Sequence, residues 1–130
     1  TLILEMKCHG NREYRSAELL ASSLRKTPNA NIIVSSFDID FLRYFRTFAP
    51  HIPLASVHNF FPEDIYFLKT ELAIEAVHLD SDLISASTDV TVFHQQGIKI
   101  RAWTVNDPSR ASDLFDLGVD MVMSDYPEQI

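Results

Sequence analysis

The feature that most constrains the fold of this 130-residue chain is its regular alternation of strand patterns with helical patterns, joined by short connections. The patterns predict strands at Leu2–Met6, Asn31–Ser35, Ile52–Val57, Ala73–His78, Ile98–Val105 and Met121–Ser124, and helices at Tyr14–Lys26, Ile39–Phe48, Pro62–Thr70, Leu83–Gln96 and Pro108–Leu117. Alternating β and α units imply a parallel sheet with right-handed crossovers. The sequence therefore predicts an α/β fold.

Two parallel-sheet architectures fit this alternation: part of a (β/α) barrel, and a self-contained doubly wound sandwich of the flavodoxin type. Length alone favours the sandwich, because a complete barrel needs roughly 250 residues. Strand polarity favours the barrel, because the central strands of a sandwich are apolar on both faces. In the strand Leu2–Met6, by contrast, Glu5 and the following Lys7 share one face with Ile3. A polar face towards a lumen and an apolar face towards helices predict the barrel.

The composition excludes some functions. The net charge is −7 and the 11 Lys and Arg residues are scattered. A nucleic-acid-binding protein is expected to carry a clustered basic footprint instead. No apolar run approaches the ~20 residues that span a bilayer. We therefore expect no nucleic-acid partner and no membrane span.

The single cysteine bears on the cellular compartment, and the first residues bear on how much of the domain the chain contains. Cys8 cannot form an internal disulfide and fits a reducing compartment, so we expect a cytoplasmic protein. The chain starts as if inside a strand, without an initiator Met. We expect residues 1–130 to be a single partial domain whose N-terminal strands are missing.

Glu5 and Lys7 are the first candidates for chemistry. They lie two residues apart on one strand, so their side chains leave the same face about 7 Å apart, at the carboxyl end where barrel active sites are built. A carboxylate there can ligate Mg²⁺ or Ca²⁺, and an ammonium group beside it suits a phosphate oxygen. Glu-x-Lys is a common sequence, however, and spacing alone favours a plain strand-end ion pair.

Four segments resemble the glycerophosphodiester phosphodiesterase family: Ile3–Lys7, Ile33–Phe37, Ala102–Asn106 and Gly118–Pro127. Their order and spacing agree with the family over nearly the whole chain, and Trp-Thr-Val-Asn with the closing segment is the more specific part. The resemblance implies a distorted TIM barrel of the PLC-like phosphodiesterase type, of which this chain is the C-terminal part. It also implies a metal-dependent enzyme of lipid metabolism, which hydrolyses small-molecule glycerophosphodiesters to glycerol 3-phosphate and an alcohol.

The resemblance assigns roles to four residues. Glu5 is expected to ligate the divalent metal, Mg²⁺ or Ca²⁺, and Lys7 to contact the substrate. Trp103 is expected to line the substrate cleft and pack against the glycerol part, although a lone Trp on a strand is often a core residue. Phe37 is a second candidate for the cleft wall, with a buried core position as its alternative.

Several motifs of the family are absent from this chain: His-Arg-Gly, Pro-Glu-Asn-Thr, the Glu-x-Asp metal pair and His-Asp. By resemblance, the two histidines that transfer protons and two of three metal carboxylates are among them. We therefore expect this chain alone to be inactive. Two other hypotheses remain open. One is a non-catalytic half-barrel that self-associates as an assembly module, and the other is a Schiff-base aldolase that uses Lys7.

The remaining polar residues have simpler interpretations. His9 is expected in a loop, and the segment from His78 to Asp82 is read as a strand end followed by a helix cap rather than a metal cluster. Asp38 and Asp40 are expected at the N-terminus of a helix. His51, His58 and His94 have no partner at metal-ligand spacing, and Cys8 has no local Cys-His arrangement.

Overall fold

The computed structural model describes residues 1–8, 10–27 and 31–130, and within them six parallel strands form one sheet in the order β1-β2-β3-β4-β5-β6. The strands are β1 (Leu2–Met6), β2 (Ile32–Ser36), β3 (Leu54–His58), β4 (Ala76–Asp80), β5 (Lys99–Trp103) and β6 (Met121–Val122). The helices are α1 (Glu13–Leu24), α2 (Ile39–Phe48), α3 (Ile65–Thr70), α4 (Thr91–Gln95) and α5 (Pro108–Asp116), with 3₁₀ turns η1 (Ser81–Leu83) and η2 (Pro127–Gln129). His9 lies outside the described residues.

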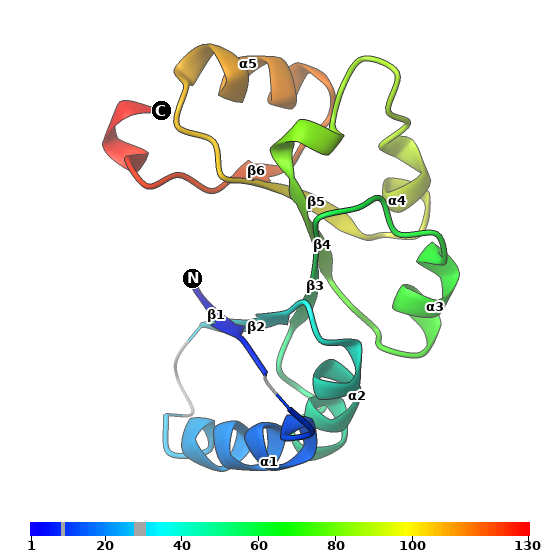
Figure 1. Ribbon diagram of the computed structural model, residues 1–130, viewed down its shortest axis with the longest axis vertical. Coiled ribbons are helices and arrows are strands. Elements are labelled where there is room, and N and C mark those ends of the chain that lie inside the picture. The colour runs from blue at the N-terminus through cyan, green and yellow to red at the C-terminus, as the bar shows by residue number, and fades with distance from the viewer. Residues whose placement is uncertain (9, 28–30) are drawn as a thin grey trace.

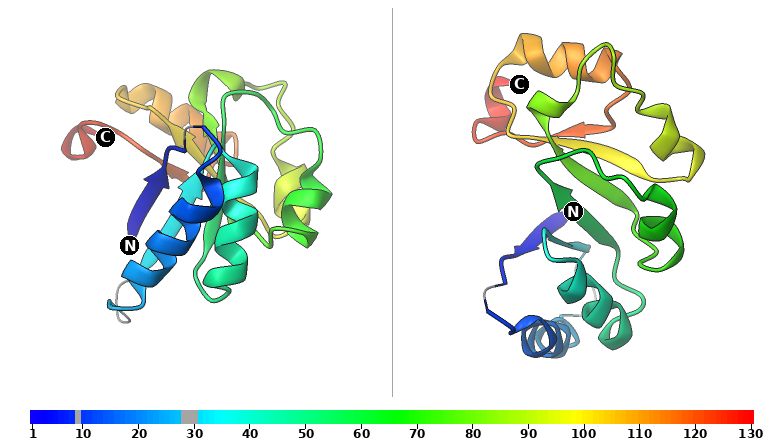
Figure 2. Two further views of the ribbon diagram at one scale, coloured as in Figure 1. Left: turned by 60° about the horizontal axis from the view of Figure 1, so that its bottom comes forward. Right: turned by 45° about the vertical axis from the view of Figure 1, so that its right-hand side comes forward.

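The sheet curls into an arc with the helices along its outer side (Figure 1). The two further views keep the helices on that side and leave the inner side of the arc uncovered (Figure 2). A doubly wound sandwich has helices on both faces and a reversal in strand order, and neither is found in the described part of the chain. The fold is therefore half of a (β/α) barrel, as the alternating strand polarity predicted.

The apolar core lies between the sheet and the helices. The strands contribute Val34, Leu54, Val77 and Ile100, and the helices contribute Phe41, Phe45, Leu68, Phe93 and Leu114, all of them buried. Each large side chain that is fully removed from water stabilises the fold by about 1.5–3 kcal/mol. The helices are thereby fixed to the outer face, and the strand residues of opposite parity must point into the lumen.

The lumen face is layered. At the amino-terminal end of the strands, Ile3 packs against a small buried cluster of Ile33, Ala55 and Ala76. The register then pairs Glu5 with Ser35, Val57 with His78, and His78 with Arg101. A mostly polar layer therefore lies above a small apolar one, at the carboxyl end of the sheet.

The prediction of a helix at Leu83–Gln96 is wrong over most of its length. Only Thr91–Gln95 is α-helical, and Ser81–Leu83 forms a 3₁₀ turn. In the loop between them, the Thr88 hydroxyl accepts a hydrogen bond from the Ser85 amide, and the Asp89 carboxylate accepts one from the Thr91 amide. Side chains of Ser, Thr and Asp that bind nearby backbone in this way compete with helix formation.

The prediction of a strand starting at Ala73 is also wrong, since β4 begins at Ala76. Ala73 has a φ of 48°, in the left-handed region that a strand cannot contain. The Arg46 guanidinium donates hydrogen bonds to the carbonyls of Leu72 and Ala73, which holds this turn against α2. Helix α3 likewise starts later than the predicted Pro62, after Asp64 accepts a hydrogen bond from the Phe67 amide.

Aspartates cap several of these segments, as predicted for Asp38 and for the segment after His78. Asp38 accepts from the Phe41 amide at the start of α2, and Asp107 accepts from the Ser109 amide at the start of α5. Asp80 accepts from the Asp82 amide, so the segment after His78 is a capped 3₁₀ turn rather than a metal cluster. Among the helices of residues 1–8, 10–27 and 31–130, none is long and apolar enough to cross a membrane.

Candidate functional site

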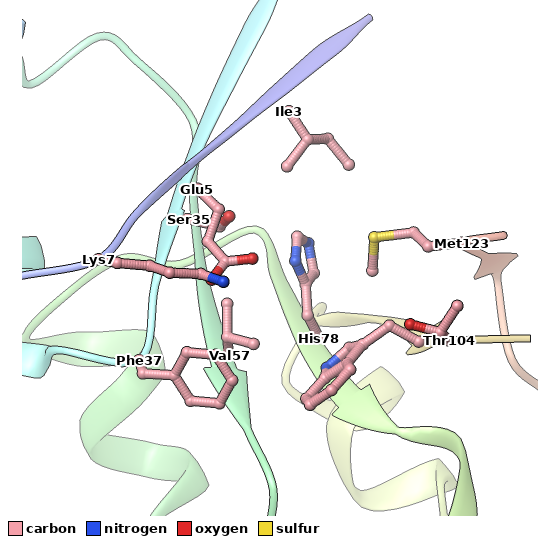
Figure 3. Close-up of a pocket in the computed structure, with 10 residues that line it drawn as sticks. Ile3, Glu5, Lys7, Ser35, Phe37, Val57, His78, Thr104 and Met123 are labelled. Carbon is pink, nitrogen blue, oxygen red and sulfur yellow. The ribbon is translucent and has the colours of Figure 1, made fainter. Parts of the chain in front are cut away.

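A cavity of about 480 Å³ opens on the lumen face at the carboxyl ends of the strands (Figure 3). Its lining comes from every strand or the residue just after it: Ile3, Glu5, Lys7, Ser35, Phe37, Val57, His78, Trp103, Thr104 and Met123. Active sites of (β/α) barrels are built at this end of the strands. All four residues singled out from the sequence, Glu5, Lys7, Phe37 and Trp103, line this one cavity.

Glu5 and Lys7 form the charged side of the cavity. The Lys7 Nζ lies 3.6 Å from the Glu5 Oε1, and both side chains line the cavity, Glu5 from β1 and Lys7 from the residue just after it (Figure 3). The pair is substantially exposed, so as an ion pair it stabilises the fold by about 0–1 kcal/mol at most. Its geometry satisfies the plain ion-pair interpretation. The pair also presents an ammonium group that can attract an anion and a carboxylate that can attract a cation.

Phe37 and Trp103 form the aromatic part of the lining. Their ring centroids lie 5.8 Å apart at an interplanar angle of 84°, an edge-to-face contact. Phe37 is 45% exposed, so the alternative of a buried core Phe is excluded. Trp103 is half-buried, and its Nε1 has no hydrogen-bond partner among the described residues.

His78 is a lining residue that the sequence analysis did not select. It is 2% exposed and lies on the lumen face of β4, with its ring between Glu5 and Met123 (Figure 3). Its Nε2 is 3.3 Å from Nη1 of Arg101 on β5. Burial, with the charge of Arg101 and the nearby His58, lowers the pKa of His78 to about 3. The imidazole is therefore neutral at physiological pH.

Ser35, Thr104 and Met123 were also missed. Ser35 is buried beside Glu5, and its Oγ has no hydrogen-bond partner in the part of the chain that the structure describes. The available signal was strand parity, since His78 and Ser35 occupy the lumen-facing positions of β4 and β2. Neither residue type is distinctive enough in a single sequence to be selected on parity alone.

The other candidates lie elsewhere. His58 accepts or donates a 2.9 Å hydrogen bond with the Ser56 hydroxyl, and burial lowers its pKa to about 4. Burial and the charge of Asp38 raise the pKa of the Cys8 thiol, which disfavours the reactive thiolate. His94 is bound to Asp120 on the outer side. Across the described ranges, no group of three His, Cys, Asp or Glu side chains converges as a metal site would require.

The Schiff-base hypothesis is not favoured by this geometry. An amine that forms such an adduct needs an apolar pocket that removes its proton. Lys7 is instead largely exposed and lies beside the Glu5 carboxylate.

Known proteins share both the sequence pattern and the half-barrel. The sequence model of the glycerophosphoryl diester phosphodiesterase family matches residues 3–129, so this chain belongs to that family. A curated relative is YhdW of Bacillus subtilis (strain 168), which is named as a candidate glycerophosphodiester phosphodiesterase. It is 28% identical over 139 residues, and the match covers 99% of this chain and 54% of YhdW.

Solved structures of related proteins contain the same half-barrel fold. A phosphodiesterase of Oleispira antarctica, in complex with its product sn-glycerol-3-phosphate, superposes with a TM-score of 0.91 at 25% identity. That match covers 99% of this chain and 53% of the other. A glycerophosphodiester phosphodiesterase of Parabacteroides distasonis gives a TM-score of 0.85 at 25% identity, covering 98% and 54% of the two chains. The chain thus spans about half the length of these relatives.

Proposed function

We propose that this chain forms the C-terminal half of a glycerophosphodiester phosphodiesterase, and that the complete protein, in which a further half-barrel precedes this one, hydrolyses a glycerophosphodiester to glycerol 3-phosphate and an alcohol. Family membership supports the reaction class, and a related structure contains sn-glycerol-3-phosphate. The observation that carries the proposal is the cavity that brings Glu5, Lys7, Phe37 and Trp103 together at the carboxyl ends of the strands.

Glu5 is proposed as one ligand of a divalent cation, Mg²⁺ or Ca²⁺. Its carboxylate oxygens are the hard donors that these ions prefer, and it points into the cavity at the barrel's active end. The remaining carboxylates would come from the preceding half-barrel. When bound, the cation would supply Lewis-acid polarisation of the phosphodiester.

Lys7 is proposed to bind a non-bridging phosphate oxygen. Its ammonium group lies near the Glu5 carboxylate and is free to rotate towards an anion, because it is held only by this exposed ion pair among the described residues. The edge-to-face pair of Phe37 and Trp103 would form the wall against which the glycerol carbons pack. The two proton-transferring histidines that the family resemblance implies would come from the preceding half-barrel.

The test is an assay of the complete protein. Release of glycerol 3-phosphate from a glycerophosphodiester should require added Mg²⁺ or Ca²⁺ and should be lost in the double variant Glu5→Gln, Lys7→Ala. Absence of metal-dependent hydrolysis across glycerophosphodiesters with several head groups would contradict the proposed function.

A second candidate is a non-catalytic half-barrel that acts as an assembly module. The observation that favours it is the open arc itself, whose terminal strands β1 and β6 each have one unpaired side within the described residues. Such edges recruit other strands. The same assay separates the two candidates, because an assembly module would associate without hydrolysing the diester.

A further inference from the structure

The lumen contains a chain of polar groups that the proposed roles do not use. It runs from His78, in the cavity, to Arg101 and then to Glu75. Arg101 is only 3% exposed, and its guanidinium donates to the Glu75 carboxylate as well as lying against His78. A buried cation is retained only where it is paired, and Glu75 provides that pairing. Arg101 is thereby anchored, and it presents a second N–H to the histidine.

This contact determines which nitrogen of His78 carries the proton. A guanidinium has only N–H donors, so the Nε2 of His78, 3.3 Å from the Arg101 Nη1, must be the acceptor. The single proton of the neutral ring is then on Nδ1. Among the hydrogen bonds of the described residues, none involves Nδ1. Because His78 lines the cavity, this N–H is a donor that a ligand in the cavity can use.

The position of His78 indicates which part of a ligand it would meet. The formally charged groups of the lining are Glu5, on β1, and Lys7, the residue just after β1. The lining from β4 onwards consists of His78, Trp103, Thr104 and Met123, none of which is charged. A phosphate belongs on the charged side. The uncharged side, with neutral donors and an aromatic face, suits a polyol.

We propose that His78 donates a hydrogen bond from Nδ1 to a hydroxyl oxygen of the glycerol group, and so selects glycerol phosphates over other phosphate ligands. This inference rests on the proposed function. It adds a specificity-determining residue on β4, positioned through Arg101 and Glu75, to the roles proposed for Glu5 and Lys7.

The test compares two ligands that differ only in the glycerol group. The dissociation constants of glycerol 3-phosphate and of inorganic phosphate are measured by titration calorimetry on the complete protein with Mg²⁺ or Ca²⁺ present. His78→Phe keeps a planar ring but removes the donor. It should weaken glycerol 3-phosphate binding about tenfold, as expected when one buried hydrogen-bonding group loses its partner, and change phosphate binding less than about twofold.

Two further variants complete the design. His78→Gln retains a donor for the ligand and an acceptor for Arg101, so it should restore glycerol 3-phosphate affinity to within about threefold of the wild type. His51→Phe makes the same change at an exposed position at the amino-terminal end of the strands, and should alter neither constant.

Equal weakening of both ligands in His78→Phe would overturn the inference, because the residue would then support the fold or the phosphate side. Unchanged affinity for glycerol 3-phosphate would overturn it as well. If the wild-type protein binds neither ligand, the proposed function itself fails and the inference fails with it. If the wild type binds both and only the His78 variants behave unexpectedly, the proposed function stands.

Discussion

At the scale of single residues, the cavity offers a phosphate two sources of positive charge: a cation held by Glu5, and the ammonium group of Lys7. Glu5 can act on a phosphate only through a cation, whereas Lys7 can bind it directly. The two side chains extend from β1 and the residue just after it and lie 3.6 Å apart, so a single phosphate can be in reach of both. Removing Glu5 should nevertheless have a different effect from removing Lys7, because only Glu5 acts through the metal.

We predict that Glu5→Gln in the complete protein weakens metal binding about tenfold or more, while Lys7→Ala leaves metal affinity within about threefold and mainly lowers kcat and phosphate affinity. The reason is that a carboxamide is a poorer ligand for a hard cation than a carboxylate. Calorimetric titration with Mg²⁺ and Ca²⁺, without substrate, measures the first effect. Lys99→Ala, on the lumen face at the amino-terminal end of β5, is the matched control. Wild-type turnover by both cavity variants at limiting metal would refute the assigned roles.

The second residue-scale prediction concerns pH. Burial lowers the pKa of His58 to about 4 from its ordinary 6.5, so the unfolded chain binds this proton more readily than the folded protein. The contribution of His58 to stability is complete above pH 6.5 and is lost as the pH falls towards 4. The free energy of unfolding should therefore decrease over this range, with His58 contributing up to about 1.4 kcal/mol per pH unit.

Urea denaturation of the complete protein at pH 5 and pH 6.5 measures this slope. His58→Gln should reduce it to the part that His78 contributes, because burial lowers the pKa of that histidine too, whereas His51→Gln, at an exposed position, should not change it. Carboxylates titrate in the same pH range, but they contribute equally to the slopes of the wild type and of both variants. Their contribution therefore cancels when these slopes are compared. Identical slopes in wild type and His58→Gln would show that the buried imidazole is not responsible.

At the scale of elements, α2 illustrates how a cap and a core face together define a helix. Asp38 accepts a hydrogen bond from the Phe41 amide at 2.8 Å, and Phe41, Leu42 and Phe45 are then fully buried against the sheet. We predict that Asp38→Ala lowers the free energy of unfolding of the complete protein by about 1 kcal/mol, with Asp38→Asn close to wild type. Urea denaturation provides the measurement.

The matched control is Asp40→Ala in the same helix turn. Asp40 makes only an exposed i,i+3 pair with Arg43, so its removal should cost less than half as much. If Asp40→Ala proves as destabilising as Asp38→Ala, the helix dipole rather than the cap bond would account for the effect.

The elements also show what could be predicted from the sequence. The alternation of polar and apolar residues around Glu5 and Lys7 predicted the lumen face and the barrel. This was possible because burial of one face is a local property of each strand. The loop after Leu83 was not predicted, because its apolar residues follow a helical spacing while Ser85, Thr88 and Asp89 bind the backbone in a competing conformation. His78 was not selected, since its proposed role depends on Arg101, which is 23 positions later in the chain.

At the scale of the whole molecule, the half-barrel presents one side of the proposed active site. We predict that the 130-residue chain, produced alone, has no measurable phosphodiesterase turnover. General acid–base catalysis contributes about 10²–10⁴-fold, and by family resemblance both proton-transferring histidines lie outside this chain. The assay measures glycerol 3-phosphate released in the presence of Mg²⁺ or Ca²⁺, with the complete protein as positive control. Metal-dependent release that disappears in the Glu5→Gln form of the isolated chain would contradict the prediction.

The surface of the isolated half-barrel leads to the last prediction. The outer edges of β1 and β6 have no strand partner among the described residues, and unpaired edges with apolar side chains recruit other chains. Leu2 on β1 and Met121 on β6 are 56% and 40% exposed. The lumen, with Ile3 and Trp103, is uncovered along the inner side of the arc (Figure 1). Light scattering after size-exclusion chromatography should therefore find oligomers or aggregates.

The edges, rather than general surface hydrophobicity, should drive this association. A charged residue at a strand edge opposes edge-to-edge pairing, so Leu2→Lys combined with Met121→Lys should shift the chain towards monomer. Tyr66→Lys removes a large hydrophobic side chain that is even more exposed, at 69%, from α3, away from both edges, and should have no such effect. A wild-type chain that elutes as a monodisperse monomer and unfolds in one sharp transition would contradict the prediction, because the open edges would then be stable in water without a partner.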